Sequence, residues 1–191
     1  MPRKKTITDD EIIIVARTFF IKEGINASTR DIAKAAGISE AVIYQRFGTK
    51  EDFFFTAMQL PKTKLDEIFG IQAGEGEVID NLVGVSLQII NYFREAMPVF
   101  LTLISHPSFN MPNFLEKHNV PAMQLSEKLT DYLVEESKLG RVRQDNLVVA
   151  VNVLLSHLHN IALYEAIDAP KTNVERNVTD TIFLLWDGLA P

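Results

Sequence analysis

Apolar positions recur along the first part of the chain with the period of an α-helix. Thr8 precedes this run and Glu11 follows three residues later, a capping-box pattern that marks a helix N-terminus. Gly24 stands where a helix commonly ends. The pattern therefore predicts a first helix between Thr8 and Gly24, and its apolar positions share one helical face: Ile12, Ile13, Ala16, Phe19 and Phe20.

Two shorter helices and the start of a fourth are predicted next. Ser28 opens the second helix with a pattern similar to a capping box, and Gly37 ends it. Ser39 is the expected N-cap of the third helix, which runs to about Phe47. Gly48 and Thr49 interrupt the pattern, and the fourth helix starts at Lys50. The inward positions of the second helix are Ile32, Ala33 and Ala36.

Helical periodicity continues beyond Pro61, and no stretch shows the sustained alternation of a strand. We therefore predict an all-α fold of about nine helices. Pro98 is expected to close one helix, because proline removes a backbone donor and clashes one turn back. The later predicted segments are residues 75–97, 99–105, 113–138 with an irregularity at Pro121, 145–168 and 172–189, with a loop over 106–112.

The charge of the chain is unevenly distributed. The 191 residues carry a net charge of −6, which by itself does not suggest a nucleic-acid partner. Residues 1–60 have a net charge of +1, and the remainder has −7. Such an asymmetry indicates two modules with different partners. An acidic second module would also repel DNA wherever the first module does not dock.

Several classes of function find no support in the sequence. The chain has no Cys, which excludes disulfides, thiolate zinc sites and cysteine nucleophiles. No Ser–His–Asp or carboxylate-pair arrangement is evident, so we expect no enzyme and no cofactor. His157 and His159 lie about 200° apart on a helix, so we expect no metal site. The first residues contain no apolar leader, which leads us to expect a cytoplasmic protein.

The segment from Thr29 to Phe47 has the spacing of a helix-turn-helix. Ala33 permits a close helix crossing, and Gly37 permits the positive φ of a tight turn. Ile38 and Ile43 would fix the helix from Ser39 to Phe47 against the helix before it, leaving a polar face for the major groove of DNA. A plain corner between two helices is the alternative interpretation of this spacing.

The N-terminal segment resembles the tetracycline-repressor (TetR) family of bacterial regulators. The residues that carry the resemblance form an ordered series over about residues 8–55: Ile12, Ile13, Ala16, Phe19, Phe20, Gly24, Ser28, Thr29, Ile32, Ala33, Ala36, Gly37, Ile38, Ser39, Ile43, Tyr44, Phe47, Lys50 and Glu51. The resemblance implies a three-helix DNA-binding domain at residues 1–50 and a larger ligand-binding and dimerisation domain at 51–191. The fourth helix, from about residue 50, would connect them.

The resemblance also implies roles for individual residues. Thr29, Tyr44 and Lys50 would bind backbone phosphates, although Lys50 could simply be a solvated residue at a helix start. Ala41 and Arg46 depart from the residues that are common in the family at those positions. Glu40 is equally compatible with a solvent-exposed carboxylate and with one that accepts from a cytosine amine. The positions expected to contact bases are Arg30, Glu40, Ala41, Val42, Gln45 and Arg46.

Residues 147–167 are apolar on almost every side, which resembles a membrane span. Polar interruptions such as Asn152 and Glu165 argue against insertion, and we expect no membrane partner. We predict instead that this helix and the last one pack on their copies in a homodimer; burial within one chain is the alternative. A two-fold dimer would read a palindromic operator in double-stranded DNA. The predicted interface residues are Leu154, Leu158, Ile161, Val178, Ile182, Leu185 and Trp186.

The middle of the chain offers side chains that could line a cavity for a small-molecule effector. Such pockets are mostly apolar with a few polar groups, although plain core packing is the alternative for each residue. The sequence thus predicts an effector-controlled, DNA-binding transcriptional repressor; the alternative is a helical protein-interaction module without DNA binding. The predicted pocket residues are Phe93, Met97, Phe100, Tyr132, Asn152, Ser156 and His159.

Overall fold

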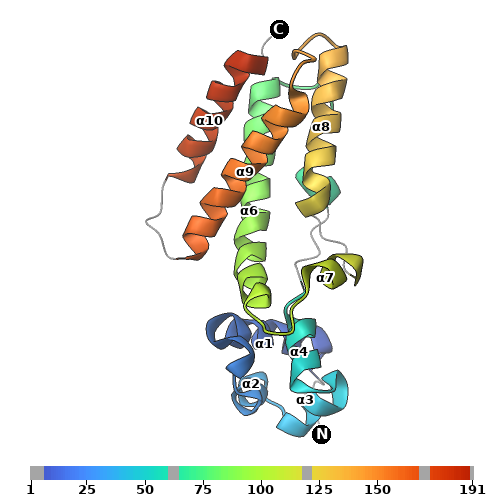
Figure 1. Cartoon of the computed structure of the whole chain (residues 1–191), viewed down its shortest axis with the longest axis vertical. Helices are drawn as coiled ribbons and strands as arrows, with labels where there is room; N and C mark the ends of the chain where they lie inside the picture. Colours follow the sequence, from blue (N-terminus) through green and yellow to red (C-terminus); the bar gives the residue numbers. More distant parts are fainter. Residues whose placement is uncertain (1–6, 60–64, 118–121, 168–172, 190–191) are drawn as a thin grey trace, which may run out of the picture. The chain divides into compact units, whose positions relative to one another are not determined.

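The computed structural model of the chain describes residues 7–59, 65–117, 122–167 and 173–189. Within these ranges the regular structure is helical and contains no strand, so the predicted all-α class is confirmed (Figure 1). In chain order the helices are α1 (Asp9–Glu23), the short 3-10 helix η1 (Gly24–Asn26), α2 (Thr29–Ala36), α3 (Glu40–Phe47), α4 (Lys50–Ala57), α5 (Leu65–Ile68), α6 (Val78–Ile104), α7 (Met111–Lys117), α8 (Ala122–Lys138), α9 (Leu147–Ala166) and α10 (Val174–Leu189).

The predicted starts and ends of the first helices are confirmed. The Thr8 hydroxyl accepts from the Glu11 N–H at 3.2 Å, and the Glu11 carboxylate accepts from the Thr8 N–H at 2.8 Å. These two bonds form a complete capping box, which satisfies two otherwise unpaired donors. Gly24 has a φ of +61° and ends α1. The Ser28 hydroxyl accepts from the Asp31 N–H at 3.2 Å and starts α2.

The prediction that Pro98 closes a helix is wrong. α6 runs without a break from Val78 to Ile104, with Pro98 inside it. A proline inside a helix costs about 3 kcal/mol or more. Met97, Val99 and Leu103 are buried around it, and burying each such side chain is worth about 1.5–3 kcal/mol. Packing therefore maintains the helix where the local preference opposes it.

The segment from residue 113 to 138 is also divided differently from the prediction. α7 ends at Lys117 and α8 begins at Ala122, and the predicted irregularity at Pro121 lies outside the described residues. The short helix α5 has no counterpart in the prediction. Gly140 follows α8 with a φ of +71°, which agrees with the predicted end of that segment.

The chain forms two compact units. Unit 1 comprises residues 1–60 and 98–117, and unit 2 comprises 61–97 and 118–191. In unit 1 the ring of Phe20 lies edge-on to Phe53 and Phe54, with centroids 5.5 and 5.2 Å apart. The Arg17 side chain donates to the carbonyl of Ala57 at 2.9 Å and so ties α1 to the end of α4. The predicted functional division at residue 50 stays a prediction.

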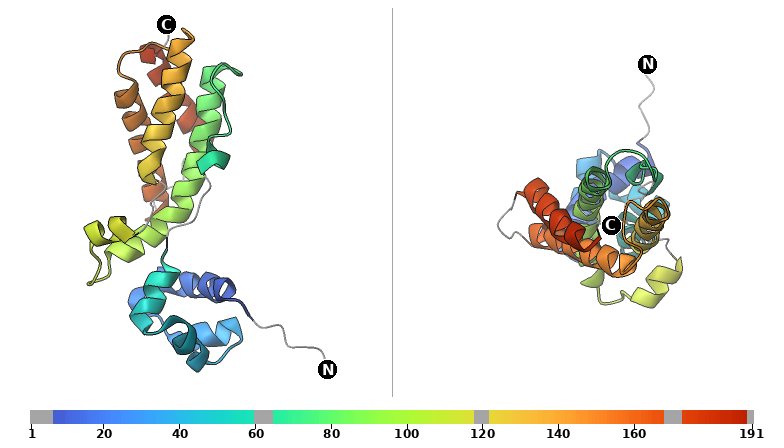
Figure 2. Two further views of the ribbon diagram at one scale, coloured as in Figure 1. Left: turned by 90° about the vertical axis from the view of Figure 1, so that its right-hand side faces the viewer. Right: turned by 90° about the horizontal axis from the view of Figure 1, so that it is seen from above.

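Unit 2 is a helical bundle in which α9 packs against α8 and α10 (Figures 1 and 2). The guanidinium of Arg94 on α6 binds the carboxylate of Glu165 on α9 through two bonds of 2.7 and 2.9 Å. Inside the bundle, the cavity lined by residues such as Leu82, Leu133 and Val151 has a volume of about 10 Å³. That volume holds about one water molecule, so the helices are closely packed there.

A buried carboxylate links α8 to the loop before α6. Glu136 is fully buried and accepts from the Tyr132 hydroxyl at 2.9 Å and from the Gly74 N–H at 3.2 Å. Arg141 lies 3.4 Å from the other carboxylate oxygen. Asn81 donates to the Tyr132 hydroxyl at 3.0 Å. Desolvation, followed by the bond to Glu136 and its charge, raises the pKa of Tyr132 to about 12, although the bond from Asn81 opposes the shift.

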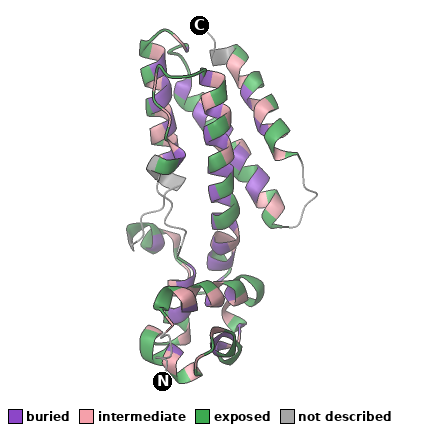
Figure 3. Cartoon of the chain, turned by 180° about the vertical axis from the view of Figure 1, so that it is seen from behind, coloured by how far each residue is buried: buried purple, intermediate pink, exposed green. Residues whose placement is uncertain are grey.

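The helix α9 is long and apolar enough to cross a membrane by length and composition, with a mean hydropathy of 1.6. In the structure it carries buried residues such as Leu154 and Leu158 toward its neighbours. Figure 3 shows that α9 and α10 also carry exposed residues along their length. The described helix is therefore a partly buried element of the bundle.

Candidate nucleic-acid interface

The helices α2 and α3 are joined by a tight turn at Gly37. Gly37 adopts the left-handed conformation, with a φ of +71° and a ψ of 28°. The Ile38 N–H donates to the carbonyl of Ala33 at 3.0 Å, and the Gly37 N–H donates to that of Lys34 at 3.2 Å. Because only glycine takes this conformation without a steric cost, the sequence fixes the angle at which α3 leaves α2.

The helix α3 buries one side chain and exposes most of the others. Ile43 is fully buried, whereas Tyr44 is 43% exposed. Ala41, Gln45 and Arg46 are exposed, and Glu40 and Val42 are half-buried. Ser39 is the N-cap as predicted, but its hydroxyl makes no capping bond. One face of α3 therefore holds the helix in unit 1, and the other presents polar and aromatic groups to solvent.

The structure brings together three of the residues predicted to contact DNA. Thr29, at the start of α2, is buried, with 6% of its surface exposed. Its hydroxyl donates to the Glu40 carboxylate at 2.5 Å and lies 3.1 Å from the Tyr44 hydroxyl. The start of α2 and the outward face of α3 thus share one polar cluster. It consists of Glu40 and two hydroxyl groups, those of Thr29 and Tyr44, which we call the hydroxyl pair.

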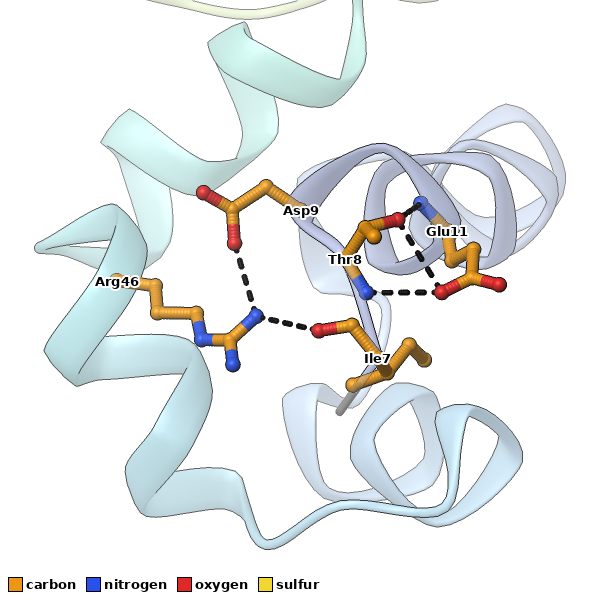
Figure 4. Close-up of polar contacts among 5 residues, drawn as sticks. All are labelled: Ile7, Thr8, Asp9, Glu11 and Arg46. Atoms are coloured by element: carbon orange, nitrogen blue, oxygen red, sulfur yellow. Dashed lines mark hydrogen bonds and ion pairs between the residues drawn. The ribbon is translucent and has the colours of Figure 1, made fainter. Parts of the chain in front are cut away.

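Arg46, at the end of α3, binds the beginning of α1 (Figure 4). Its Nη1 atom donates to the Ile7 carbonyl and to the Asp9 carboxylate, both at 2.9 Å. The side chain of Arg46 is 27% exposed and that of Asp9 is 61% exposed. Arg46 therefore joins two helix ends in unit 1, a contact that the sequence did not indicate.

The start of α4 presents Lys50 beside a capping box. The Thr49 hydroxyl accepts from the Asp52 N–H at 3.1 Å, and the Asp52 carboxylate accepts from the Thr49 N–H at 3.0 Å. The bonds from the Thr49 hydroxyl and N–H hold the pKa of Asp52 below its usual value. Lys50 is the first residue of α4 and is half-buried.

A hollow of about 850 Å³ lies beside the turn, and one of the cations that line it, Lys34, is not among the residues predicted to contact DNA. Arg30 was predicted to contact DNA, and it is exposed in this hollow. Lys34 lines the same hollow and is also exposed. Their spacing of four residues on one helix was the signal that could have identified Lys34.

The residues predicted to form an effector pocket separate into several places. Phe93, Ser156 and His159 line one open hollow of about 630 Å³, and the rings of Phe93 and His159 lie 5.6 Å apart. Asn152 accepts from the Ser126 hydroxyl at 3.0 Å. Tyr132 lies in the Glu136 network instead. Met97 is buried in unit 2, and Phe100 belongs to unit 1.

Most of the side chains predicted at the dimer interface are buried within the chain itself. These are Leu154, Leu158, Ile161, Val178 and Ile182, each with 7% or less of its surface exposed. Leu185 and Trp186 are half-buried. A side chain already covered by its own chain contributes little surface to a partner. Among the residues of α9 and α10 whose exposure the structure describes, the large apolar ones that stay exposed are Val148, Val149, Val153, Tyr164, Phe183 and Leu184.

The His residues of α9 have partners of other kinds. The His157 Nε2 atom lies 2.9 Å from the Asn177 amide oxygen, and His159 packs against Phe93. Among the residues that the structure describes, no three His, Asp or Glu side chains come together in an arrangement suited to a metal ion.

A helix-turn-helix within a helical chain defines a class of DNA-binding domain. Residues 12–57 match the model of the bacterial regulatory proteins of the tetR family. Over these residues the chain is therefore similar to that family of regulatory proteins.

Individual proteins are similar to this chain over a larger part of its length. The HTH-type transcriptional repressor KstR2 of Rhodococcus jostii strain RHA1 is 29% identical over 104 residues, which cover 50% of this chain and 50% of that protein. The TetR-family regulator PfmR of Thermus thermophilus has a similar structure, with a TM-score of 0.66, 24% identity and coverage of 92% of this chain and 97% of that one. The fatty acid degradation regulator FadR of Bacillus halodurans has a TM-score of 0.65 at 20% identity, covering 96% and 97%. These two structures show the shared fold.

Proposed function

We propose that this protein is a sequence-specific DNA-binding transcriptional repressor that acts as a homodimer under the control of a small-molecule effector. The observation that carries the proposal is the exposed face of α3, held by the turn at Gly37 beside the exposed cations of α2. A helix held in this way fits the DNA major groove. KstR2, which matches half of the chain, is itself named as a repressor.

The DNA contacts divide into two kinds. Arg30, Lys34 and Lys50 carry charges suited to phosphates, and the hydroxyl pair can donate to phosphate oxygens once its own bonds open. Gln45 is exposed in the middle of α3, where an amide can bond to an adenine edge. Phosphate contacts would set the register on the duplex, and the contacts of α3 would select the sequence.

A second copy of the chain would cover the exposed apolar side chains of α9 and α10. Phe183 is 52% exposed and Leu184 is 76% exposed on α10, and Val149 and Val153 are 59% and 49% exposed on α9. Exposed apolar side chains that gather into one surface are typical of a protein–protein interface. A two-fold dimer would carry two recognition helices and read a palindrome with half-sites about 34 Å apart, or a multiple of that distance.

The open hollow at Phe93, Ser156 and His159 is the proposed effector site. It combines an aromatic ring with a hydroxyl and an imidazole, a mixture suited to orienting a small apolar molecule with a few polar groups. A cytoplasmic location without a membrane partner follows from the same proposal, because the operator would lie on cytoplasmic DNA.

A selection from a library of random duplexes tests the proposal. The full chain should enrich a palindrome, and the enriched duplex should bind far more tightly than a scrambled one. Recovery of no palindrome would contradict the proposal and favour a helical protein-interaction module. A thermal-shift screen tests effector control, because a ligand at 100 times its Kd adds about 2.7 kcal/mol to stability.

A further inference from the structure

We infer that Glu40 is a specificity-determining residue that suppresses binding to non-target DNA by occupying the hydroxyl pair Thr29 and Tyr44. The inference rests on the proposed DNA-binding function. It concerns how the carboxylate competes with a DNA phosphate for the same two hydroxyl groups. It adds this competition to the contact with a base edge that the sequence allowed for Glu40.

Proton accounting in the cluster gives the direction of each hydrogen bond. An ionised carboxylate can only accept, so the Thr29 hydroxyl donates its one proton to Glu40 across 2.5 Å. Thr29 then has only lone pairs to offer Tyr44, which lies 3.1 Å away. Tyr44 must therefore donate to Thr29. The chain of bonds runs from Tyr44 through Thr29 to Glu40, and both hydroxyl protons are used within it.

A phosphate oxygen needs those same protons. A phosphate, like a carboxylate, accepts hydrogen bonds and carries negative charge, so Glu40 is a mimic of phosphate within the free protein. Binding any duplex through Thr29 and Tyr44 requires the bond to Glu40 to break. This cost falls on target and non-target DNA alike.

The contacts that can offset this cost, however, differ between target and non-target DNA. Non-target binding depends almost entirely on phosphate contacts, so it has no base contact that could offset this cost. Target binding adds contacts of α3 to base edges, which the released carboxylate of Glu40 at the start of α3 can join. The ratio of target to non-target affinity therefore increases because Glu40 is present.

The burial of Thr29 supports this role. With 6% of its surface exposed, its hydroxyl has little access to water that could replace Glu40. The bond to Glu40 keeps a buried donor satisfied, as is required of buried polar groups. Ser28, and not Thr29, caps α2, so the Thr29 hydroxyl is not needed to start the helix.

The test measures the Kd of the full chain for the selected duplex and for a random duplex of equal length, by fluorescence anisotropy. Glu40→Gln should tighten random-duplex binding about fivefold, because an amide oxygen accepts a weaker hydrogen bond than a carboxylate does, and it should lower the target to non-target ratio. Glu51→Gln is the matched control, because it removes the charge of an exposed carboxylate in unit 1. This control should change the ratio less than about twofold.

A double-mutant cycle separates the proposed bond from plain charge repulsion. In a Thr29→Val background the hydroxyl is gone, so Glu40→Gln should have no more effect than Glu51→Gln. If Glu40→Gln tightened random-duplex binding equally in the unmodified chain and in the Thr29→Val variant, the inference would be overturned. It would also be overturned if Glu40→Gln had no effect on that binding in the unmodified chain. If the unmodified chain binds neither duplex, the proposed function itself fails, which is a distinct result. A cooperative thermal unfolding transition of each variant, above the temperature of the binding measurement, confirms that all of them are folded.

Discussion

The guanidinium of Arg46, at the end of α3, lies 2.9 Å from the carboxylate of Asp9, the first residue of α1. This pair fixes the end of the candidate recognition helix to a helix distant in sequence. The same nitrogen also binds the carbonyl of Ile7. In the free protein, Arg46 is thus placed to position α3, whereas the sequence suggested that it reads a base.

Replacing Arg46 distinguishes these two roles. We expect Arg46→Gln to weaken binding of the selected duplex about three- to tenfold, equivalent to ~0.7–1.4 kcal/mol, without changing the sequence that a selection recovers. Asp9→Ala should reproduce this loss, whereas Asp10→Ala, at an exposed neighbouring carboxylate, should not. A changed base preference in Arg46→Gln alone would show that Arg46 reads a base.

Lys34 provides a test of the hollow beside the turn. Lys34→Gln should weaken the selected and random duplexes by the same factor and lower the slope of log K against log salt by about 0.9 for each protomer. Lys22→Gln removes an equal charge from the exposed last turn of α1 and serves as the control. An unchanged slope would mean that Lys34 does not contact phosphate.

Glu136 should be essential to the stability of unit 2. Glu136→Ala leaves the Gly74 N–H and the Arg141 charge without their partner, so the free energy of unfolding should fall by about 3–5 kcal/mol. Its exposed neighbour Glu135 pairs with Lys138 at the surface, and Glu135→Ala should cost less than about 1 kcal/mol. Urea unfolding curves measure both; similar losses would contradict the proposed importance of the buried network.

The pKa of Tyr132 predicts a dependence of stability on alkaline pH. Its pKa is raised from 10.0 in the unfolded chain to about 12 in the folded one. As the pH rises, the unfolded state therefore loses the Tyr132 proton before the folded state does. The stability that the protonated hydroxyl contributes is complete below pH 10 and disappears as the pH rises toward 12. The advantage of the unmodified chain over Tyr132→Phe should be constant below pH 10 and narrow above it, as measured by urea unfolding at each pH. A stability difference between the two proteins that stayed constant at alkaline pH would contradict the raised pKa of Tyr132.

The exposed side chains of α10 test the dimer. Leu184→Glu places a charge at a large apolar residue that is 76% exposed on α10. It should convert the dimer to a monomer at micromolar concentration, as measured by light scattering. Ile14→Glu, at a 65% exposed position of α1, should leave the oligomeric state unchanged. A monomeric unmodified chain would contradict the dimer directly.

Local signals in the sequence predicted the caps and turns of unit 1 correctly. Thr8 with Glu11, Ser28 and Gly37 act through bonds between residues close together in the chain, so spacing is enough to recognise them. The continuation of α6 through Pro98 depends on buried neighbours instead, and no local rule reports those.

Contacts between residues distant in the chain could not be predicted from the sequence either. The bond between Thr29 and Glu40 crosses the turn, and that between Arg46 and Asp9 joins residues 37 positions apart. An apolar stripe such as that of α9 shows that a face is covered, but not by which chain. Leu154 and Leu158 are covered by their own chain.

The most direct test of the central claim compares the Kd of the full chain for its selected duplex with that for a scrambled duplex across a salt series. We predict a target to non-target ratio of at least about 10³ and an affinity that falls steeply with salt, as counterion release requires. Equal affinity for the two duplexes, or an affinity independent of salt, would contradict the account.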